Sequence, residues 1–121
     1  MKDYRTIAED FHSGLSRLGK DIPQTIGGFG NLASGAVENG TLSTKVKELI
    51  AFAIAISARC DGCLAHHSQA VFKAGATRQE VAEMIGVAIL MGGGPSSVYG
   101  VEAMHAYDTF SNSEMNAPKS A

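Results

Sequence analysis

Four residues of this chain have side chains and spacings suited to thiol chemistry: Glu48, Cys60, Cys63 and His67. In a helix that turns by about 100° per residue, Cys60, Cys63 and His67 share one face. Because His67 follows Cys63 at i+4, its imidazole can reach the Cys63 thiol. The positive end of the helix dipole and its free N–H groups also favour a thiolate in the first turn. Both effects predict a lowered thiol pKa and a reactive cysteine pair.

The cysteine usage agrees with a redox role. The chain has two cysteines in 121 residues, and both belong to this Cys-x-x-Cys unit. In a reducing compartment such a pair is more often redox-active or metal-binding than structural. An i to i+3 spacing at a helix start can bring two sulfurs within bonding range, which predicts interconversion between dithiol and disulfide. Either cysteine could attack: in many such helices the first is the exposed attacker, whereas His67 favours Cys63.

Glu48 lies twelve residues before Cys60, a distance of about 18 Å on one continuous helix. If the chain instead turns back near residues 59–61, a helical hairpin brings Glu48 and His67 to heights that differ by about 6 Å, which tilt and side-chain length can span. Glu48 is also a charged residue beside the apolar run LIAFAIAI, and a carboxylate in such surroundings needs a specific partner. We therefore predict that Glu48 orients the imidazole of His67.

Apolar residues recur at helical spacing along most of the chain, which predicts a compact all-α domain of five to six helices. Aromatic residues make up 7% of the chain and tryptophan is absent, as suits closely packed helices. Residues 111–121 are expected to be a frayed tail. The predicted helices cover 3–19, 24–38, 44–58, the cysteine pair to Gly75, Thr77 to the glycines at 92–94, and Pro95 through Tyr107.

Two of these helices carry further signals. Thr77 and Glu80 form a capping box, which fixes one helix start, and the triple glycine at 92–94 is read as a helix terminator. The helix over 44–58 is apolar almost all round its axis, so a domain of this size cannot easily cover it alone. We therefore predict an obligate oligomer in which part of this helix packs against another subunit.

Length and charge restrict the function. The 121 residues fit a single domain over 1–121. The formal net charge is -2 and no basic block is present, so neither nucleic acid nor a membrane is an expected partner. The first ten residues lack the apolar core of a signal peptide, and the longest apolar run, Leu49 to Ile56, is under half a membrane span. We expect a cytoplasmic protein.

The segment KELIAFAIAISARCDGCLAHHSQAVFKAGATRQEVAEMIGVAILMGG resembles the carboxymuconolactone decarboxylase superfamily in its alkylhydroperoxidase-D-like branch, over roughly residues 42–94. That branch is marked by a Glu twelve residues before a Cys-x-x-Cys-x-x-x-His unit, and Glu48, Cys60, Cys63 and His67 fill these positions. The chain departs from the pattern at Gly62, where the best-studied members carry a second His just before the later Cys.

The resemblance implies an all-α fold assembled as trimers or hexamers, with thiol-dependent peroxidase or disulfide reductase activity. It also implies a relay in which Glu48 and His67 deprotonate Cys63, while Cys60 forms the disulfide. The expected substrate is a small peroxide or disulfide, and an external thiol would supply electrons. Neither a cofactor nor a metal is expected.

Other interpretations remain open. The pair could hold zinc, with Cys60, Cys63, His67 and either Glu48 or His66 as ligands, or be two inert buried thiols. A non-redox lactone decarboxylase or binding subunit of the superfamily is the alternative from another functional class. A thioredoxin fold is excluded because no βαβ pattern surrounds the pair. The remaining residues of note have structural interpretations. We expect His66 to face solvent or a subunit seam, and His12 and His105 to be surface or hydrogen-bonded residues. Met84, Met91 and Met104 are expected to fill the core.

Overall fold

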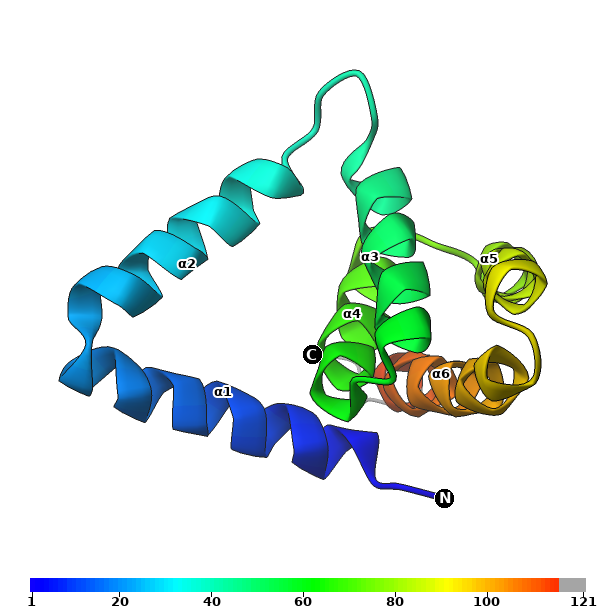
Figure 1. Ribbon diagram of the computed structural model, residues 1–121, viewed down its shortest axis with the longest axis horizontal. Helices are drawn as coiled ribbons and strands as arrows, with labels where there is room; N and C mark the ends of the chain where they lie inside the picture. The colour runs from blue at the N-terminus through cyan, green and yellow to red at the C-terminus, as the bar shows by residue number, and fades with distance from the viewer. Residues whose placement is uncertain (116–121) are drawn as a thin grey trace, which may run out of the picture.

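The computed structural model describes residues 1–115, which form six α-helices and contain no strand (Figure 1). The all-α prediction is confirmed. The expectation of a frayed tail is wrong for residues 111–115, because the last helix continues through them, and residues 116–121 lie outside the described part. The helices are α1 Tyr4–Asp21, α2 Pro23–Ala36, α3 Thr44–Ala58, α4 Asp61–Lys73, α5 Arg78–Gly92 and α6 Gly94–Met115.

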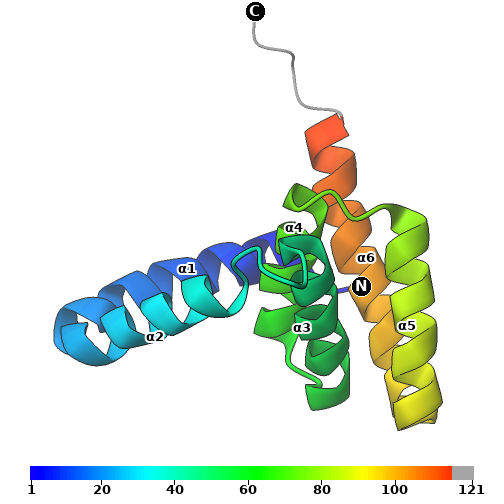
Figure 2. The same ribbon diagram turned by 90° about the horizontal axis from the view of Figure 1, so that it is seen from above.

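Helices α3 to α6 pack together as a bundle, and α1 lies across α4 and α6 (Figure 1). Helix α2 starts at the far end of α1 and diverges from it, so that the two helices form a V that projects from the bundle (Figures 1 and 2). None of the six described helices is long and apolar enough to cross a bilayer. The core consists of buried side chains from five helices, α2 excepted, with Tyr4, Phe52, Ile56, Leu64, Val71 and Val81 as its largest fully buried apolar members.

The α3–α4 hairpin is defined by its caps. Ser43 accepts a hydrogen bond from the Val46 N–H at 3.2 Å and starts α3. Helix α3 ends at Arg59, which adopts the left-handed conformation with a φ of 55° and reverses the chain. Cys60 is the N-cap of α4, and its Sγ accepts the N–H of Cys63 at 3.1 Å. The predicted hairpin, with the cysteine pair opening its second helix, is therefore confirmed.

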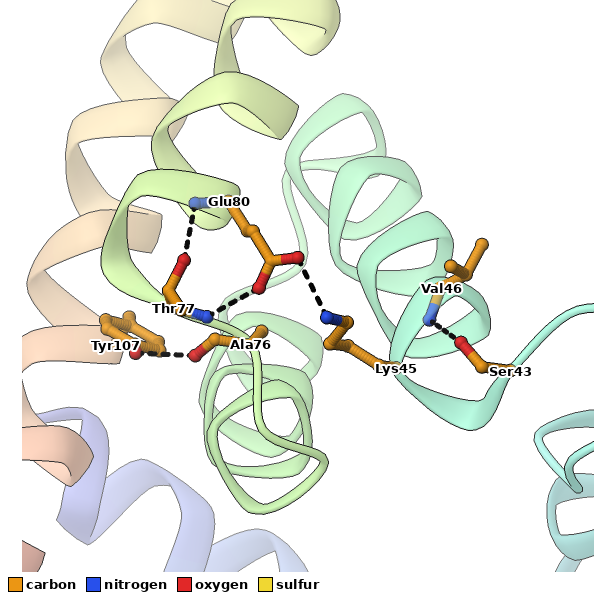
Figure 3. Close-up of polar contacts among 7 residues, drawn as sticks. All are labelled: Ser43, Lys45, Val46, Ala76, Thr77, Glu80 and Tyr107. Atoms are coloured by element: carbon orange, nitrogen blue, oxygen red, sulfur yellow. Dashed lines mark hydrogen bonds and ion pairs between the residues drawn. The ribbon is translucent and has the colours of Figure 1, made fainter.

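The start of α5 has the predicted capping box. Thr77 Oγ1 accepts the Glu80 N–H at 3.1 Å, and the Glu80 carboxylate accepts the Thr77 N–H at 2.9 Å (Figure 3). The other carboxylate oxygen of Glu80 pairs with Lys45 Nζ of α3 at 2.9 Å. Tyr107 of α6 donates its hydroxyl to the Ala76 carbonyl at 2.8 Å. These contacts fix the α4–α5 connection against α3 and α6.

Helices α5 and α6 meet through glycine. Gly93, which separates them, has a φ of 69°, a conformation that side chains disfavour. Further along α6, a Cβ added to Gly100 would lie 2.6 Å from Ile85 Cγ2 of α5. The missing side chain thus permits the close approach of the two helices. The triple glycine does end α5, as predicted.

The apolar faces are less fully buried than their periodicity predicts. Tyr4 and Ala8 of α1 are buried, but Phe11 and Leu18 are 40% and 45% exposed, because the second half of α1 runs beyond the bundle. Helix α2 has no buried residue. The prediction that Met91 fills the core is wrong, since it is 79% exposed at the end of α5. The predicted role is confirmed for Met84 and Met104, which pack against the core.

Candidate active site

The hairpin brings Glu48 and His67 together. Helices α3 and α4 lie side by side, and Glu48 Oε2 is 2.9 Å from His67 Nδ1. Glu48 is only 5% exposed, so its carboxylate is largely removed from water on the inner side of α3. The predicted hydrogen bond between these residues is confirmed, and it provides the partner that a buried carboxylate requires.

This hydrogen bond determines which nitrogen of His67 is available for chemistry. An ionised carboxylate can only accept hydrogen bonds, so Nδ1 of His67 donates to Glu48. In the neutral imidazole the lone pair then lies on Nε2, which becomes the basic atom. Glu48 can therefore both hold the ring in place and stabilise the imidazolium that forms when Nε2 takes a proton.

Cys60 and Cys63 are joined as a disulfide with a Cα–Cα distance of 5.1 Å. The helix start places them in different surroundings. Cys60, as the N-cap, accepts an N–H from the first turn of α4, whereas Cys63 lies one turn before His67 on the same helix. The first turn of the helix therefore contacts the sulfur of Cys60 directly.

A shallow pocket opens beside the cysteine pair. Its volume is about 260 Å³, and it is lined by Cys63 and His67 together with aliphatic side chains of α3. Cys60 is not among the lining residues. Cys63 and His67 thus border the same pocket in largely apolar surroundings. Its α3 side is formed by Ala51, Ile54, Ala55 and Ala58.

A second cavity lies between α1, α4 and α6 and has a volume of about 60 Å³. It contains neither cysteine, nor Glu48, nor His67, so it has no part in the thiol chemistry. Its lining residues are Arg5, Gln69, Phe72, Lys73, Phe110 and Ser113.

His66 is exposed, in agreement with the prediction that it faces solvent, and it also contacts a histidine of α1. Its Nδ1 lies 3.0 Å from Nε2 of His12 on α1, and its ring packs edge-on against His67 with the centroids 4.8 Å apart. Partial burial, followed by the nearness of His67 and His12, lowers the pKa of His66. No local pattern indicates this contact, because it depends on the position of α1 across α4.

Two further sequence inferences concern the surroundings of the pair. Gly62 faces open space, since nothing lies within 4 Å of the position that its Cβ would take. No neighbouring side chain therefore occupies the place of the second family histidine. Among the side chains that the structure describes, no group of three or more His, Cys, Asp or Glu is placed to hold a metal ion.

Comparisons with known proteins identify the family and agree with the fold. The sequence profile of the carboxymuconolactone decarboxylase family matches residues 23–106. An uncharacterised protein of Cupriavidus necator is 33% identical over 106 residues, which cover 88% of this chain and 94% of that protein. An uncharacterised Haemophilus influenzae protein is 32% identical over 67 residues, 55% of this chain and 59% of its own length.

Two crystal structures are similar throughout. One is the apo form of a carboxymuconolactone decarboxylase family protein of Legionella pneumophila, with a TM-score of 0.87 and 42% identity over 89% of this chain and 96% of its own. The other is a putative carboxymuconolactone decarboxylase of Burkholderia xenovorans, with a TM-score of 0.75 over 97% and 100% of the two chains. At 19% identity, the latter supports the fold alone. With its sequence match, its six-helix fold and its Cys-x-x-Cys pair, this chain belongs to the carboxymuconolactone decarboxylase family.

Proposed function

We propose that this protein is a thiol-dependent peroxidase or disulfide oxidoreductase in which Cys63 attacks the substrate and Cys60 resolves the product. One observation carries the proposal: the cysteine pair at bonding distance adjoins a buried carboxylate–imidazole pair, and Cys63 and His67 line the same pocket. A structural disulfide requires no oriented base beside it, whereas thiol chemistry at neutral pH does.

In the first step, Nε2 of His67 takes the proton of the Cys63 thiol, and the thiolate attacks the terminal oxygen of a hydroperoxide. The S–O bond forms as the O–O bond breaks, and the leaving alkoxide receives the proton from the imidazolium and departs as an alcohol. Cys63 is then a sulfenic acid. Glu48 stabilises the transient positive charge on the ring through its hydrogen bond to Nδ1.

In the second step, the sulfur of Cys60 attacks that of Cys63. The S–S bond forms as the S–O bond breaks, and the departing hydroxide leaves with the Cys60 proton as water. Two electrons have then passed from the two thiols to the peroxide. An external thiol must restore the dithiol by exchange through a mixed disulfide. With a disulfide substrate, the same exchange runs from the dithiol toward the substrate.

The lining of the pocket favours an organic substrate. Four of its six lining residues are Ala or Ile, so the pocket can bind an alkyl or aryl group next to the sulfur. Hydrogen peroxide has no apolar portion to make use of that lining. Cumene hydroperoxide is therefore a suitable probe.

The proposal is tested by counting thiols in the reduced full-length protein as cumene hydroperoxide is added, with zinc measured on the same sample. We expect about two thiols to be lost per peroxide consumed, a disulfide linking Cys60 to Cys63 in the peptide map, and continued consumption when dithiothreitol is supplied. The non-redox interpretation of the family predicts that both thiols persist. Thiol loss no faster than that of free cysteine, or zinc present at one atom per chain, would overturn the proposal.

A further inference from the structure

An ion pair that the proposed reaction does not use adjoins the cysteine turn. Asp61 is the first residue of α4 and stands between the two cysteines in the chain. Its Oδ2 lies 2.9 Å from Lys2 Nζ. Its Oδ1 is buried and has no hydrogen-bond partner among the described residues. The carboxylate of Asp61 thus has one oxygen paired with a cation and one poorly solvated oxygen, next to the cysteine pair.

Lys2 is held in place by several contacts of the N-terminal segment with α6. Tyr4 is fully buried and donates its hydroxyl to the carboxylate of Glu102. His105 donates Nε2–H to the carbonyl of Lys2 at 3.1 Å. The ammonium of Lys2 also lies 5.5 Å from the ring centroid of Tyr99. The segment therefore delivers the positive charge to Asp61 from a fixed position.

The charge of Lys2 is maintained by this pairing. The hydrogen bond to Asp61 raises the pKa of Lys2, which is therefore protonated whenever the cysteines titrate. Besides these two groups, the charged residues around the turn are Arg59, which precedes Cys60, and Glu102 of α6, which accepts from Tyr4. Further titratable groups are Tyr99 and His105 of α6, which contact Lys2, and the Glu48–His67 pair, whose imidazole lines a pocket with Cys63.

We propose that Lys2 and Asp61 are positioning residues that set the thiolate fraction of the cysteine pair by charge compensation. A carboxylate within one helical turn of a thiol opposes its ionisation because like charges repel. Lys2 cancels that repulsion, so the thiolate benefits from the helix terminus without the penalty of the carboxylate. This inference deepens the proposed function, since it identifies what tunes the attacking group, but ionisation of the thiols can be measured without any substrate.

The test is the rate of alkylation of the reduced, full-length protein by iodoacetamide at pH 7 and low salt, because this rate follows the thiolate fraction. Lys2→Met leaves the carboxylate uncompensated and is expected to slow alkylation by about two- to fivefold. Asp61→Asn leaves the positive charge of Lys2 unopposed, which favours the thiolate, and is expected to speed alkylation by a similar factor. The double variant should return close to the parent rate. Added salt should shrink all the differences, since both side chains are partly exposed.

Lys45→Met is the matched control, since it removes a lysine with an ion pair of the same 2.9 Å length to Glu80, away from the cysteines. It should leave the alkylation rate unchanged. Lys2→Arg keeps the positive charge and should be alkylated at the parent rate. A parent rate in this variant shows that the slowing in Lys2→Met comes from the lost charge and not from loosening of the N-terminal segment. Unchanged rates in both single variants, or changes in the same direction, would overturn the proposal. Because no peroxide is used, a failure of the proposed function is distinguishable: peroxide consumption can be absent while the opposite shifts persist.

Discussion

At the scale of single residues, the role of Glu48 is to fix the tautomer of His67. In Glu48→Gln the amide NH₂ can donate to Nδ1, which moves the ring proton to Nε2 and removes the base from the pocket. We expect peroxide-driven thiol oxidation to slow by about ten- to a hundredfold. The measurement is the single-turnover rate of thiol loss at pH 7.

Glu83→Gln makes the same chemical change at an exposed position of α5 and serves as the control. It should react like the parent protein. If Glu48→Gln also reacts at the parent rate, the carboxylate does not orient the base, and the relay must be abandoned even if the cysteines prove redox-active.

The His12–His66 contact predicts a pH-dependent stability. The pKa of His66 is lowered by burial, His67 and His12, so the folded state favours the neutral ring. As the pH falls through the ordinary histidine range near 6.5, the unfolded chain binds the proton first and stability decreases. The loss levels off below the folded pKa of His66.

Urea unfolding of the parent and of His66→Gln between pH 8 and pH 5 measures this effect. The variant should lose less stability over that interval. Between pH 8 and pH 9, where histidine does not titrate, the free energy of unfolding should change equally with pH in the two proteins. If the free energy of unfolding also falls equally in both proteins at acidic pH, protonation of His66 is not linked to folding.

At the scale of the helices, the contact between α5 and α6 depends on Gly100. A Cβ there would lie 2.6 Å from Ile85 Cγ2, and Ile85 is a buried, β-branched residue with little freedom to move. Gly100→Ala should therefore destabilise the protein by about 1–2 kcal/mol, despite the better helix propensity of alanine.

Gly86→Ala in α5 is the control, because nothing lies within 4 Å of its added Cβ. It should stabilise the protein by about 0.5–1 kcal/mol through helix propensity alone. Opposite signs of the two changes in free energy of unfolding are the predicted result. A stabilising Gly100→Ala would mean that α5 and α6 are not packed as closely as described.

The helices could be predicted from sequence where the signals are local. The capping box at Thr77 and the glycines at 92–94 act within a few residues, so the predicted boundaries agree with the structure. The Glu48–His67 contact was also predictable, because the reversal at Arg59 and the helical rise determine it. The cysteine pair also predicted the start of α4, because the residues that start a helix lie within one turn of it.

The remaining features depend on how distant helices pack, which periodicity does not specify. The contact of His12 with His66 and that of Lys2 with Asp61 both require α1 and its leading segment to lie across α4 and α6. Similarly, Phe11 and Met91 have the spacing of core residues but are exposed, since the second half of α1 runs beyond the bundle (Figure 2) and Met91 lies at the end of α5.

At the scale of the whole molecule, the exposed apolar surface leads us to expect an oligomer. Helix α2 has no buried residue, and its Leu32 is 67% exposed. On α3, Ile50 and Ile54 are 46% and 62% exposed, and Ile54 lines the pocket beside Cys63. A face of this kind is unfavourable in water unless another subunit covers it. We expect a trimer or hexamer.

Sedimentation at micromolar concentration tests this expectation. The parent protein should be a stable oligomer, and Ile50→Lys should shift it toward smaller species, because a charge would be buried at the interface. Gln79→Lys adds the same single positive charge at an exposed position of α5 and should sediment like the parent. A parent protein that remains monomeric at these concentrations contradicts the expectation.

The central claim is that the cysteine pair is redox-active, with Cys63 as the attacking thiol. It is tested most directly by timing the oxidation of Cys60→Ser and Cys63→Ser with excess cumene hydroperoxide, using a dimedone-type reagent to trap sulfenic acid. The account predicts that Cys60→Ser is oxidised as fast as the parent and accumulates sulfenic acid at Cys63, whereas Cys63→Ser reacts slowly. The reverse pattern would exchange the two roles. If the parent and both variants react only as fast as free cysteine, the redox assignment is contradicted.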